Sequence, residues 1–140
     1  MFLLAKYGTQ TTFNFPMIIR GAVDLAGAAD WTPDPADTRI SKNGAATVSS
    51  TNLPACIAAP DVHWTLTLVA AELTAAEVIV QIVDGAPKAV EDQFILIYTY
   101  GNAAAKITQD LSLANTPANL IQVLGNDLVP NGTGGQKFGL

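Results

Sequence analysis

The sequence predicts an all-β fold, because three observations point the same way. About seven short blocks alternate apolar with polar side chains or are rich in β-branched residues, which is the period-two pattern of strands. Clusters of Gly, Pro, Asn and Asp separate these blocks, as turns require. The length of 140 residues suffices for one domain with a buried core and is too short for two.

Two strands are expected at the N-terminus. The apolar stretch at 1–6 is too short for a signal peptide, and its charge follows the apolar residues, so we expect a first strand there. Residues 11–19 predict a second strand. Because Pro16 cannot donate to a β-ladder, this strand should lie at a sheet edge or bend at the proline.

A hairpin is predicted after a loop at 21–37 that is rich in Gly, Pro and Asp. Strand residues at 38–41 precede the pair Asn43-Gly44, which allows positive φ at both central positions of a type I′ turn. Residues 46–50 should form the return strand. The following segment, with Pro54 and Pro60, is expected to be a loop.

The stretch 62–100 should form the core. Residues 62–68 alternate cleanly, residues 70–76 suggest a turn or a single helical turn, and residues 78–83 are apolar on nearly both faces, as in a central strand covered on both sides. A turn at 84–88 then leads to a partner strand within 89–100. The alternation assigns Val62, Trp64, Leu66 and Leu68 to one face of the first strand, and Phe94, Leu96, Tyr98 and Tyr100 to one face of the last.

This series of short strands predicts an immunoglobulin-like β-sandwich over residues 1–101, with extended N- and C-terminal arms. Residues 102–140 should form the C-terminal arm. Within it, residues 116–125 predict a short helix or turn, because Thr116 is a good N-cap, Pro117 suits the first helical position and Gly125 suits the end. The glycine-rich tail at 131–135 is expected to be flexible.

Composition excludes several classes of function. Seven Lys and Arg face twelve Asp and Glu, for a net charge of −5, so no basic surface for nucleic acid is expected. No apolar run reaches the roughly 18 residues of a membrane helix, and we expect no membrane partner. Only 14% of residues are charged, against about 25% in typical soluble domains. Much of the surface must therefore be neutral, which favours contact with other proteins.

The sequence carries no enzymatic signature, so we expect no enzyme, no cofactor and no metal. His63 lies on an alternating strand, and Cys56, the single cysteine, has no basic neighbour in sequence to activate it. Three aspartates at 30–37 match no recognised calcium loop. Trp31 and Trp64 could stack on a sugar, although a buried Trp is the commoner use in a sandwich.

Several segments resemble small virion proteins of tailed bacteriophages, over most of residues 1–106. They are Phe-Asn-Phe-Pro at 13–16, the stretch at 21–25, the hairpin at 40–45, the runs at 73–84 and 88–93, and Tyr-Thr-Tyr-Gly-Asn-Ala at 98–103. The resemblance implies an immunoglobulin-like or adaptor sandwich. Such modules serve as capsid cement or decoration proteins, or as adaptors that attach fibres to tails, necks or baseplates.

The resemblance implies a virion structural protein that binds the major capsid protein or another virion protein. We expect a cement or decoration protein on the capsid exterior, as a homo-oligomer, that stabilises the shell by binding across its subunits. A tail, neck or baseplate adaptor is the first alternative, and a carbohydrate- or receptor-binding module is the second. Apolar residues in the arms without an evident place in the core are the expected contact residues: Phe2, Leu3, Leu4, Leu120, Ile121, Val123, Leu124, Val129 and Phe138.

Overall fold

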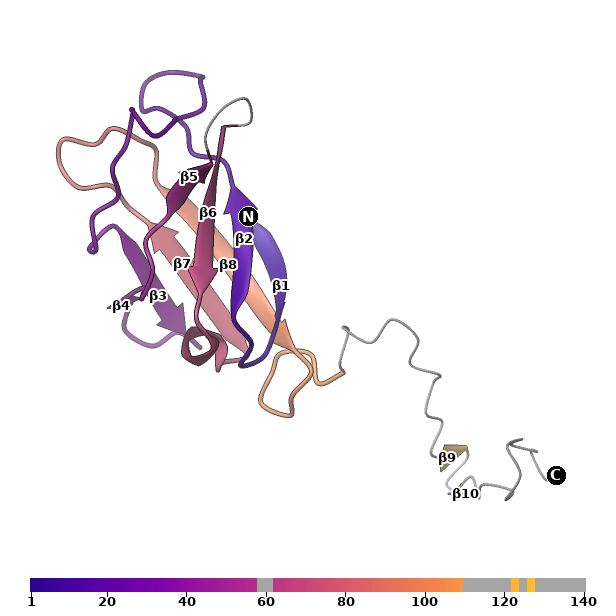
Figure 1. The fold of residues 1–140 in the computed structure, drawn as a ribbon. Helices are drawn as coiled ribbons and strands as arrows, with labels where there is room; N and C mark the ends of the chain where they lie inside the picture. Colours follow the sequence, from indigo (N-terminus) through magenta and orange to yellow (C-terminus); the bar gives the residue numbers. More distant parts are fainter. Residues whose placement is uncertain (58–61, 110–121, 124–125, 128–140) are drawn as a thin grey trace.

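Two β-sheets face each other in a computed structural model that describes residues 1–57, 62–109, 122–123 and 126–127 (Figure 1). The larger sheet has the strand order β1-β8-β7-β3-β4, and the smaller has the order β2-β6-β5. The strands are β1 Phe2–Lys6, β2 Thr11–Phe15, β3 Thr38–Lys42, β4 Val48–Ser49, β5 Ala55–Ile57, β6 His63–Leu68, β7 Glu77–Ile82, β8 Gln93–Tyr100, β9 Gln122–Val123 and β10 Asn126–Asp127. The all-β sandwich expected from the sequence is confirmed.

The first two strands belong to different sheets. β1 pairs in parallel with β8, and β2 pairs antiparallel with β6. The sheet edge expected for the strand at Pro16 is confirmed, since β2 ends at Phe15 and is the outer strand of the smaller sheet. The strands β1 and β2 lie at the same side of the sandwich (Figure 1).

The predicted hairpin after β3 is confirmed, with a shorter return strand than expected. Asn43 has φ of 50° and Gly44 has φ of 76°, as a type I′ turn requires. Only Val48 and Ser49 pair with β3, where the sequence predicted a strand over 46–50. The side chain of Asn43 also accepts a hydrogen bond from the backbone of Glu77 at 3.0 Å, which ties the turn to the start of β7.

Replacing Gly44 with alanine should lower the free energy of unfolding by about 1 kcal/mol, because a Cβ is disfavoured at positive φ. No atom lies within 4 Å of the Cβ position, so the backbone conformation alone sets this cost. Urea denaturation followed by circular dichroism measures it. Gly85→Ala is the matched control at a glycine without positive φ, and an equal loss in both variants would contradict the turn argument.

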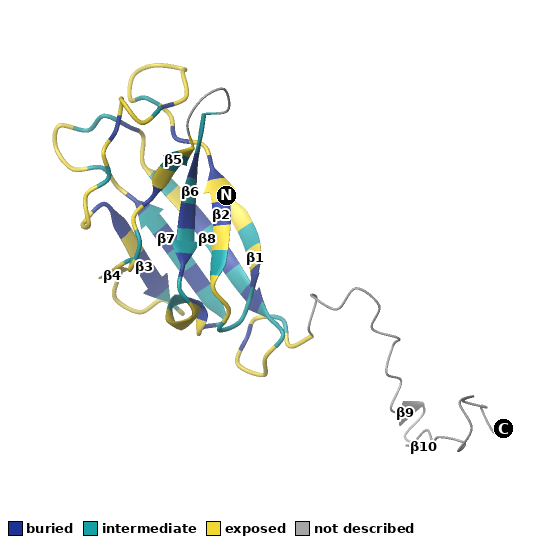
Figure 2. Ribbon diagram, in the orientation of Figure 1, coloured by how far each residue is buried: buried dark blue, intermediate teal, exposed yellow. Residues whose placement is uncertain are grey.

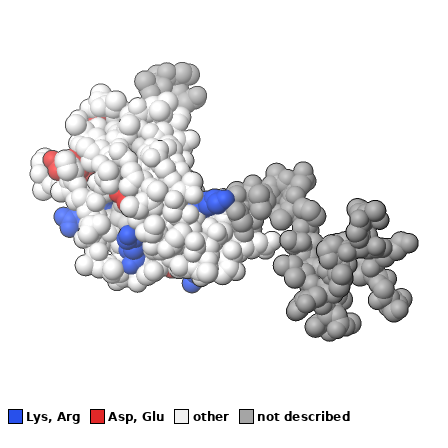
Figure 3. All heavy atoms as spheres, turned by 60° about the horizontal axis from the view of Figure 1, so that its bottom comes forward, with Lys and Arg blue, Asp and Glu red and all other residues white. Residues whose placement is uncertain are grey.

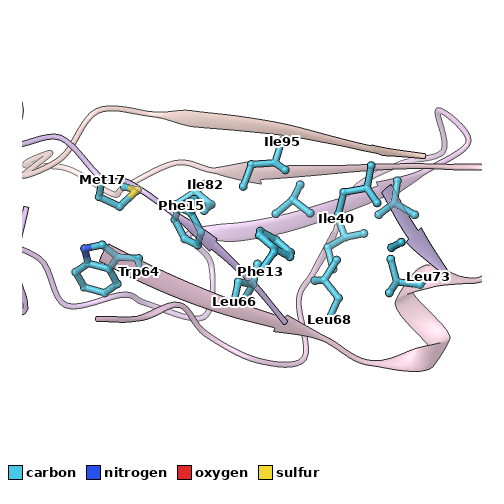
Figure 4. Close-up of a cluster of buried hydrophobic side chains, with 14 of the residues drawn as sticks. Phe13, Phe15, Met17, Ile40, Trp64, Leu66, Leu68, Leu73, Ile82 and Ile95 are labelled. Atoms are coloured by element: carbon cyan, nitrogen blue, oxygen red, sulfur yellow. The ribbon is translucent and has the colours of Figure 1, made fainter. Parts of the chain in front are cut away.

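The core lies between the two sheets and is filled by one face of each strand. The alternation predicted for residues 62–68 is confirmed, because Trp64, Leu66 and Leu68 are buried. Figure 4 shows side chains of both sheets pointing toward one another. Figure 2 shows the buried positions alternating with more exposed ones along the strands. Besides these three, the largest fully buried side chains are Met17, Ile40, Leu73, Val78, Val80, Ile82, Val90, Ile95 and Ile97.

One connection differs from the sequence interpretation, and another agrees with it. A short strand, β5, occupies part of the segment expected to be a loop, and Cys56 pairs with Trp64 of β6. The single helical turn expected within 70–76 is confirmed as a 3₁₀ helix, η1, at Ala70–Leu73. The carboxylate of Glu72 accepts hydrogen bonds from the backbone of Val69 at 2.8 Å and of Thr51 at 2.6 Å, which fixes this turn to the loop after β4.

After β8 the chain turns back on the sandwich. Ile107 forms a bridge with Tyr100, and the backbone N–H of Gly101 donates to the carbonyl of Ile107 at 2.9 Å. The segment predicted as a short helix or turn, 116–125, lies outside the described residues except for Gln122–Val123. Those two residues are extended in β9 and pair with β10, so a helix through them is wrong.

Candidate interaction surface

The outer face of the larger sheet carries an apolar patch over β1, β8 and part of β7, beside the polar side chains of Arg39, Glu77 and Gln81. On β8 the residues Ile95, Ile97 and Thr99 are buried, so Phe94, Leu96 and Tyr98 point to the opposite face. The same alternation directs Ile79 of β7 and Phe2 and Leu4 of β1 outward. We define the apolar sheet face by these side chains: Phe2, Leu4, Ile79, Phe94, Leu96 and Tyr98.

Strand register makes this surface continuous. Phe2 pairs with Leu96, and Leu96 pairs on its other side with Ile79, so one apolar row crosses β1, β8 and β7. In the next row, Leu4 pairs with Tyr98. Phe2, Leu4 and Phe94 are 54%, 46% and 51% exposed, so the described residues leave these three side chains open, while Ile79, Leu96 and Tyr98 are half-buried.

Aromatic contacts order the side chains at one end of the face. The rings of Phe2 and Tyr98 meet edge to face, with centroids 5.1 Å apart and planes at 84°. The Nζ atom of Lys106 lies 5.1 Å from the centroid of the Tyr98 ring, at the distance of a cation–π contact. The rings of Phe2 and Tyr98 are thus held in place in the free protein, which lowers the entropy cost of binding a partner.

The outer face of the smaller sheet has the opposite character. It carries Thr12, Asn14, Thr65 and Thr67, and the hydroxyl groups of Thr12 and Thr67 are hydrogen-bonded at 2.7 Å. A groove of about 420 Å³ beside it is lined mainly by hydroxyl, amide and small side chains. Such residues suit a strand face in water. Figure 3 shows few charged side chains on the side it presents, in keeping with the low charged fraction of the chain.

The structure places only some of the contact residues predicted from the sequence. Phe2 and Leu4 belong to the apolar sheet face, but Leu3 is half-buried and packs against the core. Val123 lies in β9. The remaining predicted residues lie outside the described part of the chain: Leu120, Ile121, Leu124, Val129 and Phe138.

Sequence reasoning missed the residues that β7 and β8 contribute to the face. The signal is present, because residues 78–83 are apolar on nearly both faces and residues 94–98 carry apolar side chains on both. For residues 78–83, however, this pattern predicts a central strand covered on both sides. In the structure only one face of β7 is buried, while Ile79 and Gln81 on the other are half-buried. The correction is that the larger sheet has one covered face and one open face.

The side chains considered for catalysis and metal binding lie in a loop and on two strands of the smaller sheet. Asp30 accepts a hydrogen bond from the backbone of Gly27 at 2.8 Å, and Asp37 accepts one from the backbone of Asp34 at 2.9 Å, so these carboxylates close their own loop. In the described ranges, no group of three or more His, Cys, Asp or Glu side chains could hold a metal ion. His63 and Cys56 are half-buried on neighbouring strands.

The two tryptophans considered for sugar stacking lie inside the sandwich. Trp31 and Trp64 are 4% and 2% exposed, and their ring centroids lie 4.8 Å apart. Trp64 donates its indole N–H to the carbonyl of Ala26 at 2.8 Å, as a buried indole requires. Tyr7 and Tyr98 are half-buried. The two tryptophans therefore offer no flat platform to a carbohydrate.

Within the part of the chain that the structure describes, no helix is long and apolar enough to span a membrane. The surface feature that stands out there is the apolar sheet face, which fits a protein partner better than a small polar ligand. Comparisons with protein-family models, with curated proteins and with solved structures found no match to this chain.

Proposed function

We propose that this chain is a non-enzymatic structural protein of a bacteriophage virion. It acts as a capsid cement or decoration protein on the exterior of the shell, where it binds across neighbouring subunits of the major capsid protein. The observation that carries the proposal is the apolar sheet face, a continuous surface with three large side chains at least 46% exposed. An exposed apolar patch of this kind marks a protein-binding site.

The proposed partner surface is apolar and close to neutral. Phe2 and Phe94 supply aromatic anchors, which dominate the energetics of many interfaces. Burial of the face would exclude water from a sheet whose other side is already packed, so binding requires little rearrangement of the backbone. Repetition over the shell would add avidity to a modest single contact.

We infer that the sandwich is immunoglobulin-like, since its strand order matches that topology. In such domains the strands C, F and G share one sheet and B, E and D share the other. Here β3, β7 and β8 share one sheet, and β2, β6 and β5 share the other. The short β4 extends the first sheet beyond β3, as the additional strand of variable-type domains does. One departure is that the buried Trp64 lies on β6 rather than on β3.

Copy number in purified virions tests the proposed location. Quantitative mass spectrometry of virions should give a ratio to the major capsid protein near one to one or a simple fraction of it. A handful of copies per particle would instead assign the protein to the tail, neck or baseplate as an adaptor. Its absence from virions would overturn the proposal.

Replacing Phe94 with lysine should weaken binding to purified shells at least tenfold, because a charge would be buried in an apolar contact. Phe94 is 51% exposed, so the free energy of unfolding should change little. Co-sedimentation of the purified protein with shells that lack it measures the binding. Thr12→Lys on the outer face of the smaller sheet is the matched control, and equal binding by both variants would rule out the apolar sheet face as the contact.

A further inference from the structure

The edge strands of the two sheets differ in how well they are protected against pairing with a strand of another molecule. Among the described strands, β4 has two residues and β5 has three, and short outer strands offer little to a partner. The β2 strand is followed directly by Pro16, which limits its extension. The fourth outer strand, β1, has five residues, no proline and one charge, at Lys6.

The backbone of β1 is oriented for a further strand. Leu96 donates its N–H to the carbonyl of Met1 at 2.9 Å, and Tyr7 donates to the carbonyl of Tyr100 at the same distance. The backbone groups of odd-numbered residues of β1 therefore form the hydrogen bonds to β8, while the backbone N–H and C=O of Phe2 and Leu4 point to the opposite edge. No other strand of the described chain pairs with that edge. Its side chains are also open, since Phe2 and Leu4 are 54% and 46% exposed.

An apolar cavity of about 140 Å³ lies beside the same edge, between β1 and β2. Its walls include Leu3, Ala5, Phe13, Leu68, Leu73 and Ile97. An empty apolar cavity near roughly 150 Å³ is large enough for a benzene-sized group. A strand added to β1 would cover this opening while satisfying the backbone groups of the edge.

We propose that β1 pairs with β1 of a second copy of this chain, antiparallel and about a twofold axis at Leu4. The two larger sheets then join into one sheet across the dimer. In this register Leu4 faces Leu4 of the second copy, Leu3 faces Ala5 and Phe2 faces Lys6. The apolar sheet faces of both copies become one surface.

The sequence of β1 complements itself in that register. On the inner side, the large Leu3 meets the small Ala5, so the paired side chains fill space without clashing at the cavity. In this register, inward-facing residues of one β1 strand lie opposite inward-facing residues of the other. A slip of one residue would destroy this match. A second copy is thus the occupant that the strand itself fits.

Sedimentation velocity of the full chain, from low micromolar to millimolar concentration, tests the dimer. We expect reversible dimerisation, weakened at least tenfold by Leu4→Lys, because two like charges would face each other at the axis. Phe94→Lys is the matched control, since it places the same charge on the same sheet face away from the edge and should leave the dimer unchanged. A monomer at every concentration, or a dimer broken by Phe94→Lys and not by Leu4→Lys, would overturn the proposal.

Disulfide trapping locates the contact independently. In a Cys56→Ser background, Leu4→Cys should give a covalent dimer on mild oxidation, because residues opposed in a hydrogen-bonded pair have Cα atoms about 5.5 Å apart, within disulfide range. Phe94→Cys should remain largely monomeric. Slow hydrogen exchange of the Leu4 amide in a monomer would mean that another segment of the chain occupies the edge, and would contradict the proposal. These tests use the protein alone, so their outcome is independent of virion location.

Discussion

Replacing Trp64 with alanine should lower the free energy of unfolding by about 3–5 kcal/mol. The indole is 2% exposed, packs against Trp31 with ring centroids 4.8 Å apart, and donates a hydrogen bond to the carbonyl of Ala26 at 2.8 Å. Truncation removes this packing, leaves a cavity between the sheets and leaves a buried carbonyl without its donor. Because small domains have a total stability of only about 5–15 kcal/mol, much of it would be lost.

Two further variants separate the components of that loss. Trp64→Phe keeps most of the apolar volume and removes the hydrogen bond, so it should cost about 1–3 kcal/mol. His63→Ala changes the next residue of β6, which points to the other face, and should cost less than about 0.5 kcal/mol. Urea denaturation monitored by far-ultraviolet circular dichroism compares all three. Equal losses for Trp64→Ala and His63→Ala would mean that Trp64 does not anchor the core.

The sequence predicted those parts of the fold that depend on local chemistry. The alternation at 62–68 identified Trp64, Leu66 and Leu68 as core residues, because side chains of a strand point alternately to its two faces. Asn43-Gly44 identified the turn after β3, because the backbone of these two residues tolerates positive φ. Both signals require only neighbouring residues.

The arrangement of strands in sheets could not be predicted in the same way. The parallel pairing of Leu4 with Tyr98 joins residues that are far apart in the sequence, and no local pattern encodes it. The short β5 was missed because its three residues carry no alternation, and its pairing of Cys56 with Trp64 depends on a strand elsewhere in the sequence. Long-range pairing, rather than propensity, decides such segments.

The candidate surface was only half predicted, for a related reason. When both faces of a strand are apolar, as with Phe94 and Ile95 on β8, the sequence does not say which face the second sheet will cover. The structure buries Ile95 to 1% exposure and leaves Phe94 at 51%. The smaller sheet covers only one side of the larger one, and this difference in cover, not hydrophobicity, distinguishes core from surface here.

Replacing Leu73 with alanine should lower the free energy of unfolding by about 4–5 kcal/mol, near the upper end of the range for buried leucine. Leu73 is the buried residue of η1, is fully inaccessible, and closes one end of the space between the sheets. Its side chain also lines the cavity of about 140 Å³ beside β1. Truncation would therefore enlarge an existing cavity, and each additional Å³ costs about 24 cal/mol.

The surrounding structure has little freedom to relax into that space. The backbone of η1 is held by the carboxylate of Glu72, and the carbonyl of Leu73 accepts a hydrogen bond from Gly8 at 3.1 Å. Leu25→Ala, at a leucine that is 50% exposed, is the matched control and should cost less than about 1 kcal/mol. Leu73→Met should lose less than about 1.5 kcal/mol, because it conserves volume. If urea denaturation gave the same loss of unfolding free energy for Leu73→Ala and Leu25→Ala, Leu73 would not be the residue that closes this end of the core.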